Sequence, residues 1–277
     1  MPSDKLPILL GSPFEYKSET GKTDYRLAQE QFRTLKQKIE SHNVSAKVIS
    51  TKRHSGLFDF VYVSNSALII NDFAIIARYS KKSRRGEEVV VAEYLKKQGI
   101  RCIELPDVAG LHFEGAGDCR FSHHNTHLWI GYGTGRSTRK GIDAVRRILR
   151  KELGDKAPIV HAIHIIRPVT FHIDLCLLPL PDGRMLYHRS SFSAEAQTEL
   201  YSVFGKTNCV NVPVKYHFAC NSVVISDSDI LAPMLPFPEY KEWFQTTTGM
   251  NVDFVDVSQF HIGKGSVSCM CLRMFAI

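Results

Sequence analysis

Cys269 has the sequence surroundings of a reactive thiol. It follows the flexible stretch Gly263-Lys264-Gly265-Ser266, which allows tight turns and close approach of a substrate, and it begins an apolar run. A thiol attacks well only as the thiolate, so such a cysteine needs a neighbouring base or cation. We expect Cys271, two residues on, to point to the same face of a strand. The alternative is that Cys269 is an ordinary core thiol.

His172 and Asp174 form a His-x-Asp pair. If residues 170–180 are a strand, the two side chains share one face. Imidazole acts as a general acid and base near neutral pH, and the acid can orient the ring or bind a cation. Among twelve histidines such a pair has little specificity by itself. Three histidines without this acid are expected to be structural: His161, His164 and His188.

Two acids lie in the glycine turn Phe113-Glu114-Gly115-Ala116-Gly117-Asp118. A carboxylate held there can bind a guanidinium group through two hydrogen bonds or stabilise a protonated partner. The alternative is a turn whose acids only cap nearby amides. Asp59 and Asn65 flank an apolar segment, residues 60–64, that we predict to be a strand. Both would then lie on one face and could line a pocket.

The composition is typical of a globular enzyme and narrows the classes of protein. Of the 277 residues 44% are hydrophobic and 23% charged, which suits a buried core. The net charge of +7 is spread along the chain without a nucleic-acid-binding motif, so no nucleic-acid partner is expected. No apolar stretch is long enough for a membrane span. The apolar run at residues 6–10 is too short for a signal peptide, which predicts a cytoplasmic protein.

Short strands alternate with amphipathic helices. Helices are predicted at 25–42, 86–98, 137–153, 194–204 and 238–247. The apolar face of the first helix consists of Leu27, Phe32, Leu35 and Ile39. Gly99 is expected to end the second helix. Strands are predicted within 57–79, with a turn at Asn71-Asp72, and at 121–132, 159–166, 170–180, 208–213, 217–225, 252–257 and 268–275. Roughly five units recur at about 50 residues, as in a propeller-like array. Without a linker, residues 1–277 are expected to form one domain. The odd number of cysteines, seven, favours reduced core thiols.

The ensemble of motifs resembles the guanidino-group-modifying enzymes, the pentein superfamily. From about residue 57 to the end, the segments DFVYVSNSALIIND, SRRGEE, FEGAGD, GRSTRKG, FHIDLCL, FACNSVVI and GSVSCMCLRM follow the family order. The members include arginine deiminase, arginine dihydrolase, succinylarginine dihydrolase, dimethylarginine dimethylaminohydrolase and the glycine amidinotransferases. The resemblance implies an α/β fold, a five-bladed propeller of ββαβ units around an acidic pocket.

The resemblance also implies roles for individual residues. Cys269 would attack the guanidinium carbon and form a covalent S-amidino intermediate. His172 would act as general acid and base, and Glu114 would be the acid that pairs with this system and stabilises it. The substrate-binding residues would be Asp59, Asn65, Arg84, Arg136, Asp174 and Asp118, with the two arginines holding the α-carboxylate of the substrate. A surface salt bridge is the alternative for each arginine. The partner would be a small guanidino compound, with no metal or cofactor needed, and a homodimer is among the expectations.

Two departures affect the choice of reaction. Ser64-Asn65 stands where most single-step hydrolases carry Glu-Asp, whereas arginine dihydrolase and succinylarginine dihydrolase also carry asparagine. The amide can donate to a neutral ureido oxygen, which suits a second hydrolysis. The second asparagine of arginine dihydrolase has no clear counterpart in residues 12–25, and FEGAGD is one residue longer than usual. An arginine-dihydrolase-like or deiminase-like reaction is favoured. The alternatives are dimethylarginine dimethylaminohydrolase, an amidinotransferase or a non-catalytic binding or scaffold protein.

Overall fold

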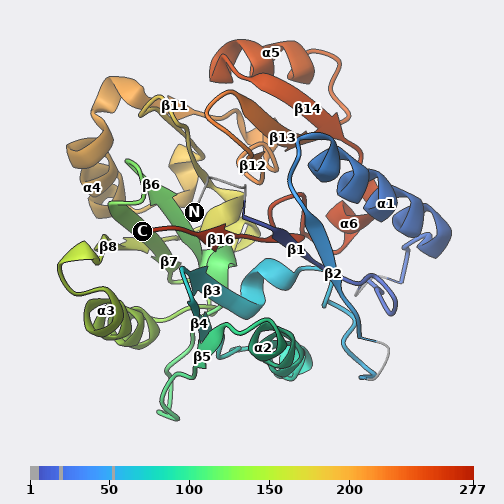
Figure 1. Cartoon of the computed structure of the whole chain (residues 1–277). Coiled ribbons are helices and arrows are strands. Elements are labelled where there is room, and N and C mark those ends of the chain that lie inside the picture. Colours follow the sequence, from blue (N-terminus) through green and yellow to red (C-terminus); the bar gives the residue numbers. More distant parts are fainter. Residues whose placement is uncertain (1–5, 19–20, 52–53) are drawn as a thin grey trace.

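The structure, a computed structural model, describes residues 6–18, 21–51 and 54–277. Within these residues the strands form five small sheets, and helices lie around their outside (Figure 1). The helices are α1 Tyr25–Ser41, α2 Glu87–Lys97, α3 Arg139–Leu153, α4 Ala194–Phe204, α5 Tyr240–Thr248 and α6 Ser258–Ile262. The strands are β1 Ile8–Gly11, β2 Ala46–Ile49, β3 Ala67–Ile70, β4 Phe73–Ile76, β5 Arg101–Ile103, β6 Cys119–Ser122, β7 His127–Tyr132, β8 Ile159–His164, β9 Leu177–Pro179, β10 Met185–Tyr187, β11 Cys209–Asn211, β12 Val223–Val224, β13 Asp229–Pro233, β14 Asn251–Val255, β15 Cys271–Leu272 and β16 Met274–Phe275.

The five sheets are built in the same way. An antiparallel pair such as β3 and β4 is followed by a helix, here α2, and then by a strand parallel to the second, here β5. A helical crossover is what a parallel pairing requires. The same order recurs in β6-β7-α3-β8, β9-β10-α4-β11 and β12-β13-α5-β14.

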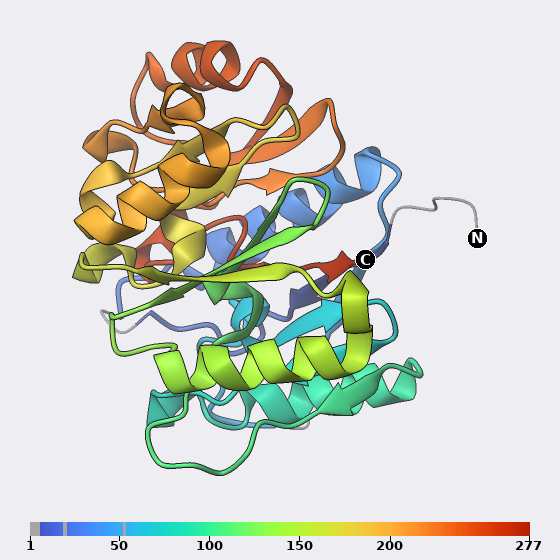
Figure 2. The ribbon, with the colours of Figure 1, turned by 90° about the vertical axis from the view of Figure 1, so that its left-hand side faces the viewer.

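The remaining sheet joins the two ends of the chain. β1 pairs in parallel with β2 across α1, and its antiparallel partner is β15, near the C-terminus. The last strand, β16, adds in parallel to β3. The C-terminal segment that carries Cys269 is therefore anchored between two sheets. In the view turned by 90°, α3 lies across the front of the molecule, outside the strands (Figure 2).

All the predicted helices are present in the structure. They could be predicted because their caps and apolar faces have clear sequence patterns. Asp24 caps α1 by accepting a hydrogen bond from the amide of Leu27, and Gly99 has the positive φ of a helix stop. On α1, Phe32, Leu35 and Ile39 are buried as expected. The expectation for Leu27 was wrong, since its side chain is 36% exposed and Ala28 faces the core instead.

The predicted strands were only partly correct. The hairpin at Asn71-Asp72 is confirmed, with Asn71 in the left-handed region at φ 51°. In contrast, residues 57–66 contain turns and a 3-10 helix, Val63–Ser66, instead of a strand. Most of 170–180 and 217–225 is also turn or 3-10 helix. An apolar run shows that a segment is buried, but it does not distinguish a strand from a buried turn.

Several elements had no prediction: β1, β2, β5, β10, β13 and α6. The apolar run at residues 6–10 falls mostly in β1. In the stretch 12–25, where a second asparagine was looked for, residues 19 and 20 lie outside the described part of the chain. No helix in the described ranges is long and apolar enough to cross a membrane. All seven cysteines are free thiols, and five of them are buried.

Candidate active site

A cavity of about 810 Å³ collects most of the predicted site residues. We call it the main cavity. Its wall includes Cys269 and His172. Four predicted substrate-binding residues also line it: Asp59, Asn65, Arg84 and Arg136. Three predicted acids lie just behind the wall and bond to residues that form it or support it: Glu114, Asp118 and Asp174.

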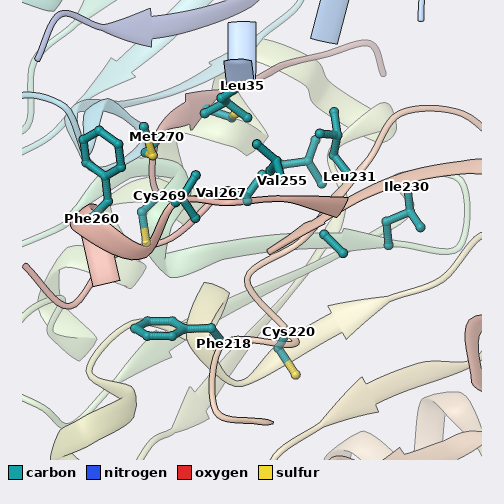
Figure 3. Close-up of a cluster of buried hydrophobic side chains, with 14 of the residues drawn as sticks. Leu35, Phe218, Cys220, Ile230, Leu231, Val255, Phe260, Val267, Cys269 and Met270 are labelled. Atoms are coloured by element: carbon teal, nitrogen blue, oxygen red, sulfur yellow. The ribbon is translucent and has the colours of Figure 1, made fainter. Parts of the chain in front are cut away.

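Cys269 lies in a turn directly before β15 and is 3% exposed. Its Sγ is 3.3 Å from Asp174 Oδ2 and 3.2 Å from Nδ2 of Asn221. The same Asn221 side chain accepts a hydrogen bond from the Cys269 amide through Oδ1, at 3.2 Å. Cys269 and Met270 point to opposite sides of the chain, with Met270 in the core (Figure 3). The thiol is thus held from both its backbone and its sulfur.

Cys269 and Cys271 do not share a face, so that prediction was wrong. Because Cys269 is in a turn and not in a strand, the alternation of side chains does not apply between them. Cys271 lines a second cavity, separate from the main cavity. The two glycines before Cys269, Gly263 and Gly265, leave space for the side chain of Tyr62. A Cβ on Gly265 would lie 2.2 Å from the Tyr62 ring, and a Cβ on Gly263 would lie 2.2 Å from the Tyr62 hydroxyl.

The surroundings of Cys269 disfavour the thiolate while the main cavity holds no cation. Burial raises the pKa of the Cys269 thiol well above its usual value, and the nearby Asp174 carboxylate raises it further. Hydrogen bonds from the Ser266 backbone and the Asn221 side chain lower the pKa only in part, and among the described residues no cation contributes. A positively charged group placed against Asp174 and the sulfur would favour the thiolate.

His172 and Glu114 form a buried ion-pair geometry, with His172 Nε2 2.8 Å from Glu114 Oε2. Burial by itself raises the pKa of the Glu114 carboxyl, but the hydrogen bond and charge of His172 and the charges of Arg136 and Arg84 lower it overall. An ionised carboxylate only accepts hydrogen bonds, so Nε2 carries the proton. The nitrogen free to exchange a proton is therefore Nδ1.

His172 and Asp174 do not sit in a strand as predicted, because His172 precedes the 3-10 helix Ile173–Leu175. The tight turn nevertheless directs both side chains to the site, His172 to Glu114 and Asp174 to Cys269. One oxygen of Asp174, Oδ1, is buried without a hydrogen-bond partner in the described chain. That oxygen is available to a ligand that donates hydrogen bonds.

Asn65 is oriented by Arg84. Arg84 Nη1 donates to Asn65 Oδ1 at 2.7 Å, so the Asn65 amide nitrogen points to His172 Nδ1, 3.4 Å away. The predicted strand that would place Asp59 and Asn65 on one face is absent, but both line the main cavity. Gly117 allows this packing, because a Cβ there would lie 1.8 Å from the Asn65 nitrogen.

Neither predicted arginine forms a surface salt bridge. Arg84 is 4% exposed and donates to Glu87 through Nε at 3.0 Å and Nη2 at 2.6 Å. Arg136 is 8% exposed, donates to Glu114 at 3.0 Å and lies 4.8 Å from the centre of the Phe171 ring. Most donors of Arg84 are therefore engaged within the protein, whereas Arg136 keeps donors that can reach the cavity.

Asp118 supports the site from behind and does not line the main cavity. One of its oxygens accepts from the Ser137 hydroxyl at 2.6 Å, and the other from the amide of Ile173, next to His172, at 3.3 Å. Burial raises the pKa of the Asp118 carboxyl to about 6. Its contacts fix the chain beside His172 and leave little room for a substrate.

Two further residues lie at the site although the sequence had not predicted them there. Asn221 contacts Cys269, and its signal was an amide inside the otherwise apolar segment FACNSVVI. His188 was expected to be structural, yet it lines the main cavity with its Nε2 unpartnered in the described chain. Burial lowers the pKa of His188 to about 4, which favours a neutral ring. Among the described residues no cluster of His, Cys, Asp and Glu could hold a metal ion.

Known proteins are similar to this chain over most of its length. No family model matches the chain. An uncharacterized protein of Caenorhabditis elegans is 30% identical over 256 residues, 92% of this chain and 86% of the relative. The bifunctional arginine dihydrolase/ornithine cyclodeaminase ArgZ of Synechocystis is 29% identical over 98% of this chain, which spans only 38% of the relative's length. A dimethylarginine dimethylaminohydrolase of Mycobacterium tuberculosis is 28% identical, with 92% and 78% covered.

Solved structures give the same result. The N-terminal domain of ArgZ, bound to product, superposes with a TM-score of 0.88 at 25% identity and covers 99% of both chains. A variant of that domain covalently bonded to a reaction intermediate superposes with a TM-score of 0.87 at 25% identity. The fold is a mixed α/β fold shared with these proteins. The chain belongs to the guanidino-group-modifying, or pentein, superfamily. Its similarity extends to the arginine dihydrolases and the dimethylarginine dimethylaminohydrolases within that superfamily.

Proposed function

We propose that this protein is a cysteine-dependent hydrolase of the guanidino group of arginine or a close derivative. The observation that carries the proposal is that two reactive pairs meet at one cavity. In one pair the Cys269 thiol lies beside the Asp174 carboxylate, and in the other the His172 imidazole lies beside the Glu114 carboxylate. The first pair suits attack on a cationic carbon, and the second suits proton transfer. The similarity to guanidino hydrolases supports the same reaction.

The substrate itself would activate the nucleophile. A guanidinium group bound against Asp174 Oδ1, which has no partner in the described chain, would place its positive charge beside the Cys269 sulfur. That charge opposes the two causes that raise the pKa of the thiol, burial and Asp174. The bound guanidinium would thus promote formation of the thiolate, whereas the empty enzyme would keep its thiol protonated.

The chemical steps follow from the protonation of His172. When the guanidinium binds, the proton of the Cys269 thiol moves to Nδ1 of His172, and the thiolate attacks the guanidinium carbon as the carbon–sulfur bond forms. His172 passes the proton on Nδ1 to the leaving nitrogen as the carbon–nitrogen bond breaks, which leaves an S-amidino intermediate. His172, now neutral at Nδ1, removes a proton from water, which attacks the same carbon. The carbon–sulfur bond breaks, which releases the ureido product after loss of its extra proton to solvent and restores the Cys269 thiolate beside protonated His172. Glu114 keeps Nε2 protonated throughout.

Arg136 is the better placed of the two predicted arginines to hold the α-carboxylate of the substrate, because Arg84 is committed to Glu87 and Asn65. Asn65 bears on whether the ureido product is hydrolysed again. Its amide nitrogen could donate to the ureido oxygen, which favours a dihydrolase-like second round of attack by the thiolate that the first round restores. Since this chain spans 38% of ArgZ, only the arginine dihydrolase reaction, and no second activity, is proposed here.

The proposal has a direct test in product analysis. The purified protein is incubated with arginine, monomethylarginine and dimethylarginine, and ornithine, citrulline and ammonia are resolved. Ornithine with two ammonia from arginine is the expected result. Citrulline alone would identify a deiminase-like reaction, and turnover of dimethylarginine alone the alternative hydrolase. Cys269→Ala should abolish product, while the matched control Cys271→Ala, in the separate cavity, should retain it. No turnover of any of the three compounds contradicts the proposed substrate class.

An amidinotransferase would use the same intermediate but pass it to an amine, so added glycine would then replace water as the acceptor. A non-catalytic scaffold is distinguished by labelling with a haloacetamidine: selective reaction of Cys269, blocked by arginine, supports catalysis, and uniform slow reaction of the thiols opposes it.

We further propose that the five sheets are the blades of a five-bladed propeller and that residues 1–277 form one domain, on the basis of the repeated strand order. The cytoplasmic location and the homodimer stay predictions.

A further inference from the structure

A second cavity of about 500 Å³ lies on the other side of the segments that carry the catalytic residues. We call it the rear cavity. Ser64 and Ser268 line it, whereas their neighbours Asn65 and Cys269 line the main cavity. No described residue lines both cavities. Its volume lies within the range of small-molecule sites, about 300–1,000 Å³.

Two arginines line the rear cavity, Arg120 and Arg273. Arg120 is bound to the protein: it donates to the carbonyls of Leu177 at 3.1 Å and Asp174 at 3.3 Å and to the Ser268 hydroxyl at 2.9 Å. In the described chain the Arg273 guanidinium has no hydrogen bond or ion pair, and its one recorded contact is the Phe275 ring, 5.3 Å from its centre. The donors of Arg273 are therefore available to a ligand.

The charge of these arginines is not neutralised by the carboxylates of the same wall. Asp182 is paired with Arg184 at 2.6 Å, and Asp227 is exposed. The Arg273 side chain is half-buried, and burial, with Arg120 as a further cause, lowers its pKa to about 10, so its unpaired charge is disfavoured there. A charge removed from water needs a counter-charge or hydrogen-bond partners to offset the loss of solvation. An anion in the rear cavity would supply both.

Ser64 provides an independent observation at the same place. Its side chain is 2% exposed, and its hydroxyl is buried without a hydrogen-bond partner in the described residues. A buried hydroxyl without a partner is unfavourable, and a hydroxyl can donate to an oxyanion. Ser64 and Arg273 come from distant parts of the chain and line one cavity, each with unused donors.

We propose that the rear cavity binds a small oxyanion, a carboxylate or a phosphate, through Arg273, Ser64 and Arg120. The planar guanidinium of Arg273 matches two oxygens of such a group. Arg120 also links this site to the proposed nucleophile, because it holds Ser268, next to Cys269, and the backbone of Asp174. The ligand would thus bind on the side of these residues opposite the guanidino substrate.

The test is calorimetric titration of the full chain with sodium phosphate and, separately, sodium succinate, at constant ionic strength in chloride. At least one of the two anions should bind saturably at one site, and the tighter one identifies the chemical source. Arg273→Met should weaken binding about tenfold or more, since hydrogen bonds to charged groups contribute at least that much. Ser64→Ala, which removes only a hydroxyl and tests the site if the first variant does not fold, should weaken it less.

Two controls separate this site from others. Arg101→Met removes an exposed arginine paired with Glu152, and Arg136→Met removes an arginine of the main cavity. Both should leave the affinity for the anion unchanged. The proposal is overturned by the absence of saturable binding of either anion, by an affinity unchanged in Arg273→Met and Ser64→Ala, or by a loss in Arg136→Met equal to that in Arg273→Met.

Discussion

The Cys269 thiol and the Asp174 carboxylate are buried together, with Sγ 3.3 Å from Oδ2. A carboxylate is an unfavourable neighbour for a thiolate, and burial adds to the effect, so the pKa of the thiol is raised. Such a pair is unsuited to a cysteine that must be reactive at all times. It suits a cysteine whose substrate is a cation, because the substrate then balances the carboxylate and the thiolate together.

The first prediction concerns Asp174→Asn. Removal of the carboxylate lowers the pKa of Cys269, so the substrate-free variant should be alkylated by iodoacetamide faster than the unchanged protein at the same pH. Turnover of arginine should nevertheless fall about thirtyfold or more, as expected when one partner of a buried charged pair is removed. The measurements are the pH profile of inactivation and kcat/KM. If alkylation and turnover changed in the same direction, the proposed role of Asp174 would be wrong.

The second prediction concerns Asn65→Asp. The new carboxylate accepts hydrogen bonds from Arg84 but cannot donate to a ureido oxygen, so the share of ornithine in the products should fall and that of citrulline should rise. Product ratios from arginine at equal conversion measure the effect. Asn71→Asp, in the exposed turn between β3 and β4, is the matched control. An unchanged product ratio in Asn65→Asp would show that Asn65 does not determine whether one or two hydrolyses take place.

The helices could be predicted from the sequence because caps and apolar spacing are local signals, whereas the gathering of the site residues was predicted from the resemblance to a known superfamily. Tyr25–Ser41 and Ala194–Phe204 begin and end within a residue of the predicted ranges. The strand predictions at 57–66 and 170–180 failed for one reason. Segments at the centre of a fold are apolar whatever their backbone, so the hydrophobic pattern there records burial only.

The contacts within the site depended on tertiary structure and had no sequence signal. Arg84 and Arg136, for which a surface salt bridge was the alternative to substrate binding, form buried ion pairs, and each contacts a different carboxylate, Glu87 and Glu114. The sequence places Glu87 at the start of the helix predicted at 86–98 but does not pair it with Arg84. The spacing of residues along the chain cannot show which of two nearby acids a long side chain will reach, because this depends on how the sheets pack.

The third prediction concerns the buried pair of Arg84 and Glu87, whose Nη2 and Oε2 are 2.6 Å apart. Arg84→Met leaves the Glu87 carboxylate buried without its cation, which should cost about 3–5 kcal/mol of unfolding free energy. The double variant Arg84→Met/Glu87→Leu removes both charges and should recover much of this loss. Urea unfolding of the three proteins measures the effect. A double variant no more stable than the single one would show that the pair is not the cause.

The last prediction concerns pH and Asp118. The pKa of its carboxyl in the folded protein is raised to about 6, above the roughly 3.9 of an unfolded chain. The folded state therefore holds the proton more tightly, and stability from this group is present below about pH 4 and lost as pH rises to about 6, by about 3 kcal/mol in total. Asp118→Asn has no such proton, so its stability relative to the unchanged protein should increase across this window and then level off.

Denaturant unfolding of both proteins between about pH 4 and pH 7 measures this difference, within which the titrations of all other groups largely cancel. The Asp118→Asn variant would also lose part of the contacts to Ser137, so a constant, pH-independent offset between the two curves is expected. The exposed Asp143→Asn serves as control and should run parallel to the unchanged protein. A difference for Asp118→Asn that stays flat with pH would mean that the carboxyl remains ionised in the folded protein. The contact of Asp118 with the Ile173 amide would then be a charged one that fixes His172 at every pH.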